Sequence, residues 1–250
     1  MEKHKIINNN RDCPLCGEGK KNSTIINGTN CFCNNCSLIY NSELKIYDDV
    51  KHWTNFTFNL STHSYDMSRI KFFQYLWKYI CRITKKTREG RILDVGCGLG
   101  IILKIASGDN WVAEGIEISE QIVDFAKKYS NCKVYLGKIE NLNLNLEYDF
   151  IFLIDTFRHL ENPLKTLDYC SRFLKNNGAI IIRDLNAKNF SIKKRIKKNN
   201  DYDLQFLSKE TAKKFLEKIG IRNTRPYPSP MSLFGLPLIK KYRIVFKTSL

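Results

Sequence analysis

Apolar residues in the C-terminal two thirds of the chain gather into short, mainly apolar runs. Five of these runs are expected to be strands, at residues 92–95, 111–119, 133–137, 148–155 and 178–184. Strands buried on both faces have this nearly uniform pattern, whereas strands with one wet face alternate. Because segments of helical character separate the runs, the pattern predicts a parallel sheet with its binding edge at the carboxyl ends of the strands. Two further β-stretches are expected near 221–227 and 242–247.

Recurrence of apolar residues every three or four positions predicts the helices. Residues 66–86 have this period, and Asp66 is a candidate N-cap. The other start and stop signals are Ser119 before a helix over 120–129, Asn162 and Pro163 before a second helix, and Gly220 after a third over 208–219.

A glycine-rich turn joins the first of these strands to the helix that follows it. The stretch Asp94-Val95-Gly96-Cys97-Gly98-Leu99-Gly100 has the pattern D-x-G-x-G-x-G. Glycines allow a tight turn with positive φ, and without Cβ atoms the backbone can contact a ligand. Strand, glycine turn and helix form a nucleotide-binding unit, with Asp94 at the strand end, where a carboxylate can receive a cation or hydroxyls. A dinucleotide site or a plain connection is the alternative interpretation of the glycines alone.

The second strand ends in an acidic residue. Glu117 lies about 20 positions past the glycine turn, where a carboxylate accepts hydrogen bonds from the two hydroxyls of a ribose. Glu114 lies earlier in the same strand and is less suitably placed.

Composition and net charge limit the kinds of protein that this chain can be. The chain has 250 residues, 43% of them hydrophobic, and no apolar run of about 18 residues that would span a membrane. Residues 1–5 are polar and lack the apolar core of a signal peptide, so a cytoplasmic location is expected. The net charge of +16 fits a phosphate-rich partner, or it reflects a lysine-rich composition, because the only dense basic run is at 193–198.

Four cysteines near the N-terminus have the spacing of a zinc site. Cys13 and Cys16 form one C-x2-C pair, and Cys33 and Cys36 form a second, 16 residues further on. Two such pairs complete a tetrahedral Zn²⁺ site, and four protein ligands leave no open position, so the zinc is expected to be structural. Cys31 is an alternative to Cys33 as a ligand. A segment of about thirty residues is too small to form a hydrophobic core by itself, so a structural metal ion is a physically reasonable source of stability.

The expected organisation has three parts. A zinc-ribbon-like module covers 1–45, a linker or lid covers 46–65, and one larger domain covers 66–250. The linker is aromatic and polar without a clear period. It contains His52 and His63, which can act as ligands or bases but more often are plain surface residues.

Residues 66–250 together resemble the class I S-adenosylmethionine (SAM)-dependent methyltransferases. The motifs occur in the order of that family: residues 93–100, the strand ending at Glu117, and the stretch from Tyr148-Asp149-Phe150 to His159-Leu160. The whole chain is similar to a subgroup that joins an N-terminal zinc-binding motif to this domain. Its members are frequently found in the modification of sugars, polysaccharides and natural products. The resemblance implies a Rossmann-like α/β fold with a mostly parallel seven-stranded sheet and helices on both faces.

The resemblance also implies which residues bind SAM. The implied set is Asp94, Gly96, Cys97, Gly98, Glu117, Ile118, Lys138, Ile139 and Asp155. His159 and Asp155 are the catalytic candidates, because they follow the fourth strand at the ligand edge. His159 would be a general base for an oxygen acceptor, or else a structural residue that bonds the backbone of its turn.

The chain departs from the family pattern at several positions. Many relatives have an acidic residue where Arg158 stands, a histidine where Asp203 stands, and an acidic residue where Lys138 stands. The phrase at 174–178 looks like the family's usual turn between a helix and a strand, with asparagine in place of the more common proline and glycine.

The sequence favours SAM-dependent O-methylation of a small molecule, with a sugar or nucleotide-linked sugar as the acceptor class. Methylation of ribosomal or transfer RNA is the first alternative, since zinc modules precede such domains too and the net charge suits a phosphate backbone. A zinc-ribbon interaction protein with a degenerate SAM domain is the second alternative.

Overall fold

The computed structural model describes residues 5–8, 10–46, 67–86, 89–188, 193–194, 196, 203–227 and 242–245. The expected linker, with His52 and His63, and the expected cap Asp66 lie outside the described residues. Within the described part of the chain, no helix is long and apolar enough to cross a membrane.

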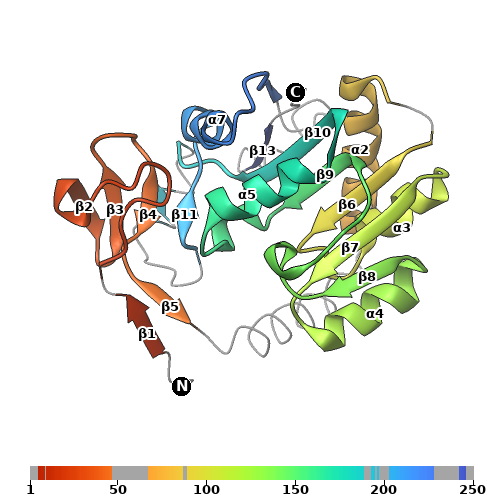
Figure 1. Ribbon diagram of the computed structural model, residues 1–250, viewed down its shortest axis with the longest axis horizontal. Coiled ribbons are helices and arrows are strands. Elements are labelled where there is room, and N and C mark those ends of the chain that lie inside the picture. Colours follow the sequence, from red (N-terminus) through yellow and green to blue (C-terminus); the bar gives the residue numbers. More distant parts are fainter. Residues whose placement is uncertain are drawn as a thin grey trace.

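A seven-stranded sheet forms the centre of the molecule (Figure 1). Its spatial order is β12-β13-β10-β9-β6-β7-β8. The strands are β6 Arg91–Val95, β7 Val112–Glu117, β8 Lys133–Leu136, β9 Tyr148–Ile154, β10 Leu174–Leu185, β12 Pro226–Tyr227 and β13 Tyr242–Val245. Every pairing from β10 to β8 is parallel, whereas β13 is antiparallel to both of its neighbours. The predicted mostly parallel, seven-stranded sheet is confirmed, and five neighbouring strands of the seven, β10 to β8, form its parallel part.

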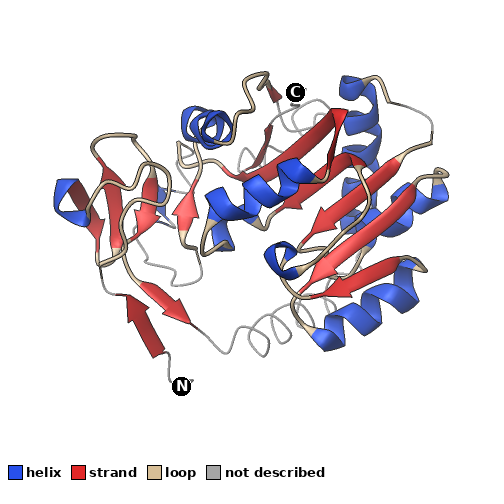
Figure 2. Cartoon of the chain, in the orientation of Figure 1, coloured by secondary structure: helices blue, strands red, loops and turns tan. Residues whose placement is uncertain are grey.

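Helices cover both faces of the sheet (Figure 2). One face is covered by α2 Met67–Thr84, α3 Ile101–Gly108 and α4 Glu120–Ser130, and the other by α5 Pro163–Arg172 and α7 Lys209–Lys218. Three 3-10 turns are η1 Lys20–Asn22, η2 Ile139–Asn141 and η3 Phe157–His159. The expected helix starts at Ser119 and Asn162 are confirmed, because each side chain accepts a hydrogen bond from the backbone of the helix that follows. In α7, Ser208 is the N-cap rather than the first residue of the helix.

Alternate residues of the buried strands serve two separate cores. Phe150 and Phe152 of β9 pack on the α2 side, and Ile151 and Leu153 pack on the α5 side. Trp111 stacks on Phe150 with ring centroids 5.1 Å apart. Such a pair adds about 0.5–1.5 kcal/mol to the area that it buries. This two-sided burial is the physical reason for the uniform apolar runs in the sequence.

The phrase at 174–178 is not the predicted turn between a helix and a strand. Strand β10 already begins at Leu174, which pairs with Tyr148. The pairing with β9 then shifts before Ala179, so residues 175–178 bulge out of the ladder. The turn-forming asparagines and glycine therefore make an irregular start to the strand.

A second, four-stranded sheet is built around the N-terminal cysteines. Its order is β11-β4-β3-β2, formed by β2 Ser23–Asn27, β3 Asn30–Cys33, β4 Ile39–Asn41 and β11 Gln205–Phe206. A separate pair joins β1 Lys5–Asn8 to β5 Leu44–Ile46. The strand β11 comes from the far end of the sequence and pairs antiparallel with β4, so the small sheet is completed by the methyltransferase-like part of the chain (Figure 1).

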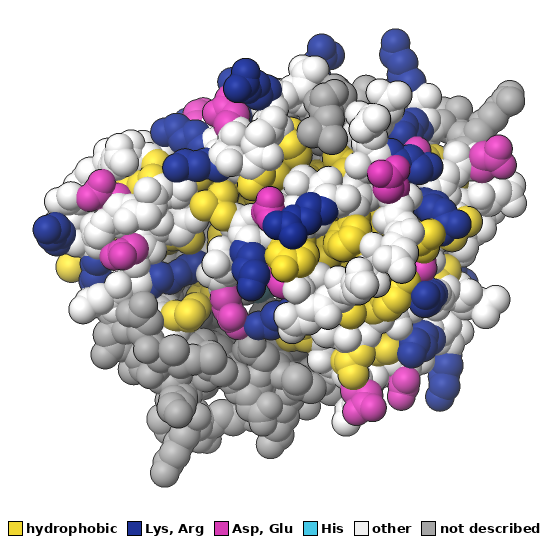
Figure 3. All heavy atoms as spheres, in the orientation of Figure 1, with side chains coloured by type: hydrophobic (Ala, Val, Ile, Leu, Met, Phe, Trp, Pro, Cys, Tyr) yellow, Lys and Arg dark blue, Asp and Glu magenta, His cyan; other side chains and the backbone are white. Residues whose placement is uncertain are grey.

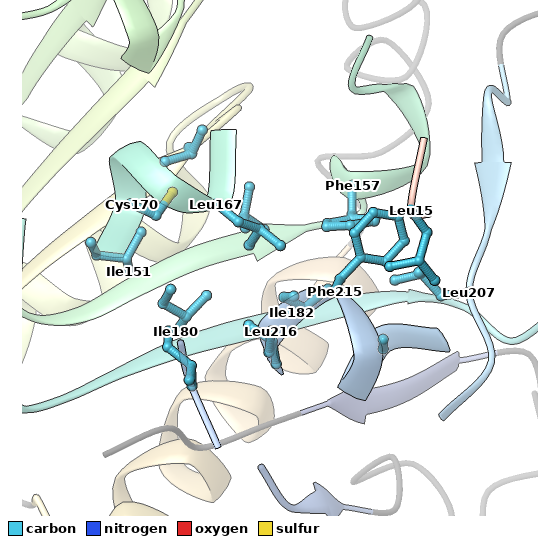
Figure 4. Packing of buried hydrophobic residues seen from close by; sticks show 14 of the residues in the cluster. Leu15, Ile151, Phe157, Leu167, Cys170, Ile180, Ile182, Leu207, Phe215 and Leu216 are labelled. Carbon is cyan, nitrogen blue, oxygen red and sulfur yellow. The ribbon is translucent and has the colours of Figure 1, made fainter. Parts of the chain in front are cut away.

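The small sheet and the large sheet share one hydrophobic core. Leu15, from the first cysteine pair, lies in the same buried cluster as Phe157, Leu207 and Phe215 (Figure 4). Phe157 and Phe215 meet edge to face with centroids 5.1 Å apart. The N-terminal module thus packs against the large domain beside α7 and the segment that follows β9.

Candidate functional site

The binding edge lies where the strand order reverses. From β6 the chain proceeds to β7 and β8 on one side, and it then returns to β9 and β10 on the other. Open parallel sheets bind ligands at this switch point, at the carboxyl ends of the strands. Gly96, just after β6, has φ +76°, and a Cβ built there would lie 2.6 Å from Oγ1 of Thr156, just beyond β9. Glycine at 96 therefore lets two strand ends approach each other.

Gly98 has a different role from Gly96. It has φ +52°, and a Cβ built there would meet no atom within 4 Å, so its surroundings are open. A side chain at 96 would strike Thr156, whereas a side chain at 98 would enter the space above the turn. Gly98 is therefore the glycine that leaves room for a ligand.

Glu117 holds the glycine turn against the end of β7. Its carboxylate accepts hydrogen bonds from the backbone N–H groups of Gly98 (3.1 Å), Ile118 (2.8 Å) and Ser119 (3.3 Å). Burial raises the pKa of Glu117 above its ordinary value, and the three N–H groups oppose that rise. Each carboxylate oxygen has two acceptor sites, so the group retains capacity for hydroxyl donors.

Asp94 is a buried carboxyl with an unsatisfied oxygen. Its side chain lies at the end of β6 and is 4% exposed, and Oδ1 has no hydrogen-bond partner among the described residues. Burial and the negative charge of Glu117 raise the pKa of Asp94 to about 8. A cation bound here would satisfy the oxygen and relieve the repulsion. The site therefore fits the positively charged amino group of SAM.

The other residues implied for SAM binding lie around the same edge. The Cys97 thiol is turned inward, since a Cβ at Gly115 would lie 2.7 Å from its sulfur, so only the backbone of Cys97 faces the turn. Ile118 is half-buried, and Ile139 is buried in η2. Lys138 forms an ion pair with Glu161, Nζ to Oε1 2.9 Å, which links the loop after β8 to the loop after β9.

Asp155 belongs to a network of charges at the ends of β9 and β10. It has φ +58°, and its carboxylate accepts hydrogen bonds from Arg183 and from Arg158 Nη1 (3.4 Å). The same Nη1 donates to Asp184 Oδ1 at 2.6 Å, and Asp184 Oδ2 accepts from the Arg158 backbone N–H at 2.9 Å. Three carboxylates of the network raise the pKa of Arg158 despite its burial.

Two departures from the family pattern turn out to be one contact. Arg158 Nε lies 3.2 Å from Asp203 Oδ1, and Asp203 is fully buried. The same oxygen lies 3.9 Å from Nδ1 of His159. Arg158 and Asp203, two of the positions at which the sequence departs from the expected motifs, thus contact each other and carry opposite charges.

Two members of this network, Arg183 and Asp184, were not predicted from the sequence. They lie at the end of the fifth apolar run, much as Asp94, Glu117 and Asp155 lie at or near the ends of the first, second and fourth. The rule that polar residues at strand ends face the site would have found Asp184, whereas nothing local indicates that Arg183 pairs with Asp155.

The four predicted zinc ligands come together. The sulfur atoms of Cys13, Cys16, Cys33 and Cys36 all lie within 4.8 Å of one another, with 3.4 Å between Cys13 and Cys36 and 3.5 Å between Cys16 and Cys33. Tetrahedral Zn²⁺ with bonds of about 2.3 Å places sulfurs about 3.8 Å apart, so the cluster fits zinc. Cys31 lies outside this cluster, and its sulfur is directed at the Thr29 carbonyl.

We expect one zinc ion per chain, measured by elemental analysis of the purified protein. Cys13→Ser removes one of four thiolates and is expected to reduce zinc to well below one ion per chain. Cys31→Ser, a buried cysteine of the same sheet, is the matched control and should keep its zinc. Chelation should lower the melting temperature, because structural zinc contributes folding free energy. Full occupancy in Cys13→Ser, or loss in Cys31→Ser, would contradict the ligand set.

Asp94 also predicts a pH dependence of stability. A carboxyl whose pKa is raised by folding stabilises the protein at low pH, and this contribution is lost as pH rises through the folded pKa of about 8. Between pH 5 and 8 the ligand-free protein should lose up to about 1.4 kcal/mol of unfolding free energy per pH unit through this group. Asp94→Asn should remove that slope in urea unfolding experiments. Asp124→Asn, an exposed control on α4, should retain it. Parallel pH profiles for all three proteins would refute the assignment.

Comparison with known sequences identifies a family. A family profile described as "Methyltransferase domain" matches residues 86–220, more than half of the chain. An uncharacterized protein of Methanocaldococcus jannaschii is 30% identical over 142 residues, which cover 55% of this chain and 67% of that protein. A ubiquinone biosynthesis O-methyltransferase of Coxiella burnetii is 28% identical over 120 residues, which cover 45% of this chain and 50% of the relative. The chain thus spans about half the length of that enzyme.

Comparison with solved structures agrees on the fold. The plantazolicin methyltransferase BpumL, solved with a monoazolic desmethylPZN analog and S-adenosylhomocysteine (SAH), superimposes with a TM-score of 0.61. It is 20% identical, and the match covers 80% of this chain and 90% of BpumL. The profile match, the sheet order and the glycine turn together establish that this chain belongs to the class I SAM-dependent methyltransferases, an enzyme family.

Proposed function

We propose that Asp94, Gly98 and Glu117 form the SAM site. The buried Oδ1 of Asp94, which has no hydrogen-bond partner in the part of the chain that the structure describes, is the observation that carries this proposal. It would accept the cationic amino group, and the open backbone at Gly98 would lie along the methionine part. Glu117 would accept the ribose hydroxyls, since its two oxygens match two adjacent donors. Gly96 and the backbone of Cys97 would support the turn.

The adenine end would lie between the loops after β7 and β8. Ile118 and Ile139 supply the apolar surfaces there. The side chain of Lys138 is drawn toward Glu161, so its aliphatic part, rather than a carboxylate, would border the ring.

The reaction we propose is methyl transfer to an oxygen of a small hydroxylated molecule, with a sugar or nucleotide-linked sugar as the first choice. SAM, when bound, supplies an activated methyl group, so the chain's main tasks are to position the acceptor and to remove its proton. His159 is the proposed base. Its Nδ1 faces Asp203 at 3.9 Å, and a nearby carboxylate stabilises the imidazolium that forms when Nε2 takes a proton.

Two observations support this acceptor class. The edge beyond the proposed SAM site presents the carboxylate of Asp155, whose side chain is 36% exposed beside Arg158 and Arg183, and a carboxylate placed in this way suits an acceptor rich in hydroxyls. The relative from Coxiella burnetii is described as an O-methyltransferase, which accords with transfer to oxygen.

RNA methylation is the second candidate, and the net charge of +16 is what favours it. On the face shown in Figure 3, however, lysines and arginines are interspersed with aspartates and glutamates. A surface of that kind lacks the continuous basic track, with stacking aromatic residues, that follows a single strand of nucleic acid.

The SAM site can be tested by calorimetric titration of SAH. Glu117→Ala leaves the two ribose hydroxyls without an acceptor and should weaken the binding free energy by roughly 2–4 kcal/mol. This takes hydrogen bonds to a charged group at about 1.5–3 kcal/mol each, with some non-additivity. That energy corresponds to about a 30- to 1,000-fold loss of affinity. Glu120→Ala removes an exposed carboxylate three residues away and is the matched control. Unchanged affinity in Glu117→Ala would show that the ribose lies elsewhere, and wild-type protein that binds neither SAM nor SAH would refute the site.

The acceptor class can be tested by measuring SAH release with panels of sugars, nucleotide-linked sugars and tRNA. For an oxygen acceptor, His159→Gln should lower kcat by about 100-fold or more while SAH affinity is retained, since general-base catalysis contributes about 10²–10⁴-fold. Binding of tRNA should be weak and should fall steeply between about 50 and 200 mM salt. Tight, sequence-dependent RNA binding, or full kcat in His159→Gln, would contradict the proposal.

A further inference from the structure

Arg11 belongs to the zinc module by sequence, but its side chain binds to the far end of the chain. Its guanidinium donates to the Glu161 carbonyl at 2.7 Å, the Leu204 carbonyl at 3.2 Å and Gln205 Oε1 at 3.2 Å. These partners lie 150 to 194 positions away in sequence. The side chain is buried, with 7% exposed. Burying a guanidinium without hydrogen-bond acceptors would be costly, so these three acceptors are what stabilises the Arg11 side chain in this buried position.

The segment that Arg11 holds also holds the loop of the proposed base. Gln205 Nε2 donates to the carbonyls of Phe157 (2.6 Å) and Leu160 (3.0 Å), which flank His159. The Leu204 N–H donates to the Arg158 carbonyl at 2.8 Å. The turn η3, which carries His159, is thus fastened to residues 204–205 on both of its sides.

The same segment is anchored to the zinc module through β4 and the residue that follows it. The Asn41 N–H donates to the Leu204 carbonyl at 2.8 Å, and Gln205 pairs with Tyr40 of β4. The Arg11 N–H donates to the Ser42 carbonyl at 2.8 Å. Arg11 lies two residues before Cys13, so the position of its backbone depends on the cysteine cluster that zinc would hold.

We propose that Arg11 is a positioning residue that couples zinc occupancy to the acceptor side of the methyltransferase site. Zinc holds Cys13 in place, and Cys13 in turn fixes the backbone of Arg11, two residues earlier. Arg11 and Gln205 together then hold the loop at 157–161. The cofactor side depends on different contacts, because Glu117 is held by Gly98, Ile118 and Ser119. Loss of zinc, or of the Arg11 side chain, therefore loosens the acceptor loop and leaves SAH binding intact. The inference rests on the proposed function only in assigning the acceptor to the His159 loop.

The test uses the whole 250-residue chain with three variants and a control. Arg11→Met keeps much of the apolar length of the side chain and removes its hydrogen-bond donors. Gln205→Met removes the amide that links Arg11 to the loop at 157–161, the clamp, and leaves the cysteine cluster unchanged. Lys21→Met removes an exposed positive charge from the zinc module and is the matched control. Arg11→Lys keeps the charge with fewer donors. Zinc content, SAH affinity, hydrogen exchange of 155–161 and 203–207, and the NMR shift of the His159 ring are measured for each protein.

Both methionine variants should retain zinc and bind SAH within about twofold of wild type. Amide exchange in 155–161 and 203–207 should be about 10- to 100-fold faster, as expected when buried hydrogen bonds of a local unit are lost. The His159 signal should shift, since Asp203 lies beside it. Arg11→Lys should give a smaller effect, and Lys21→Met none. Chelation of zinc from wild-type protein should reproduce the Arg11→Met exchange pattern.

Three outcomes would overturn the inference. Unchanged exchange and an unchanged His159 signal in both methionine variants would show that the clamp does not position the loop. Loss of zinc in Arg11→Met would place Arg11 in the metal site instead. If chelation of zinc lowers the protection of amides 94–118 against hydrogen exchange as much as that of 155–161, zinc stabilises the whole domain rather than the acceptor loop. Failure of wild-type protein to bind SAH refutes the proposed function separately, because the exchange coupling is measured without any ligand.

Discussion

The hydrogen bond that the Gly98 N–H of the glycine turn donates to Glu117 is the contact on which the binding edge depends. It joins the end of β7 to the turn after β6, and together with the N–H groups of Ile118 and Ser119 it offsets part of the cost of burying a carboxylate. Asp94 lies beside this contact, and its Oδ1 has no donor among the described residues. Burial and the charge of Glu117 raise the pKa of Asp94 to about 8, so a second negative charge at this edge is disfavoured until a cation binds. A binding edge of this kind is suited to a ligand that carries a positive charge.

The other half of the edge has the opposite character, because its charges are paired. Asp155, Asp184 and Asp203 surround the guanidinium of Arg158, and Arg183 also binds Asp155. Breaking such a buried network by removing one partner leaves an uncompensated charge and is strongly destabilising. We therefore regard Arg158 as an organiser of the acceptor side, while His159 at its border is the group suited to proton transfer.

The zinc module is part of the catalytic domain rather than an appendage. It obtains its fourth strand from residues 205–206, and Leu15 completes the core that contains Phe157 and Phe215. A module of about thirty residues can bury little apolar surface alone, so packing on a larger core and binding a metal both supply what it lacks. The same arrangement brings Arg11 to the acceptor loop.

Much of the fold and of the candidate site is determined locally, and these parts could be predicted from the sequence. The buried strands, the caps Ser119 and Asn162, the positive-φ glycines and the two C-x2-C pairs depend on neighbours within a few residues or on a fixed spacing. The polar residues at strand ends follow from parallel topology, which puts all carboxyl ends at one edge. Other features depend on the tertiary structure alone. The two-residue strand β11 has no period to detect, and the Arg11–Gln205 and Arg158–Asp203 contacts join residues far apart in sequence. Which of these charges pair was decided by the tertiary structure, because folding brings residues 203–205 against η3, where Asp203 is removed from water beside Arg158 and Gln205 meets Arg11.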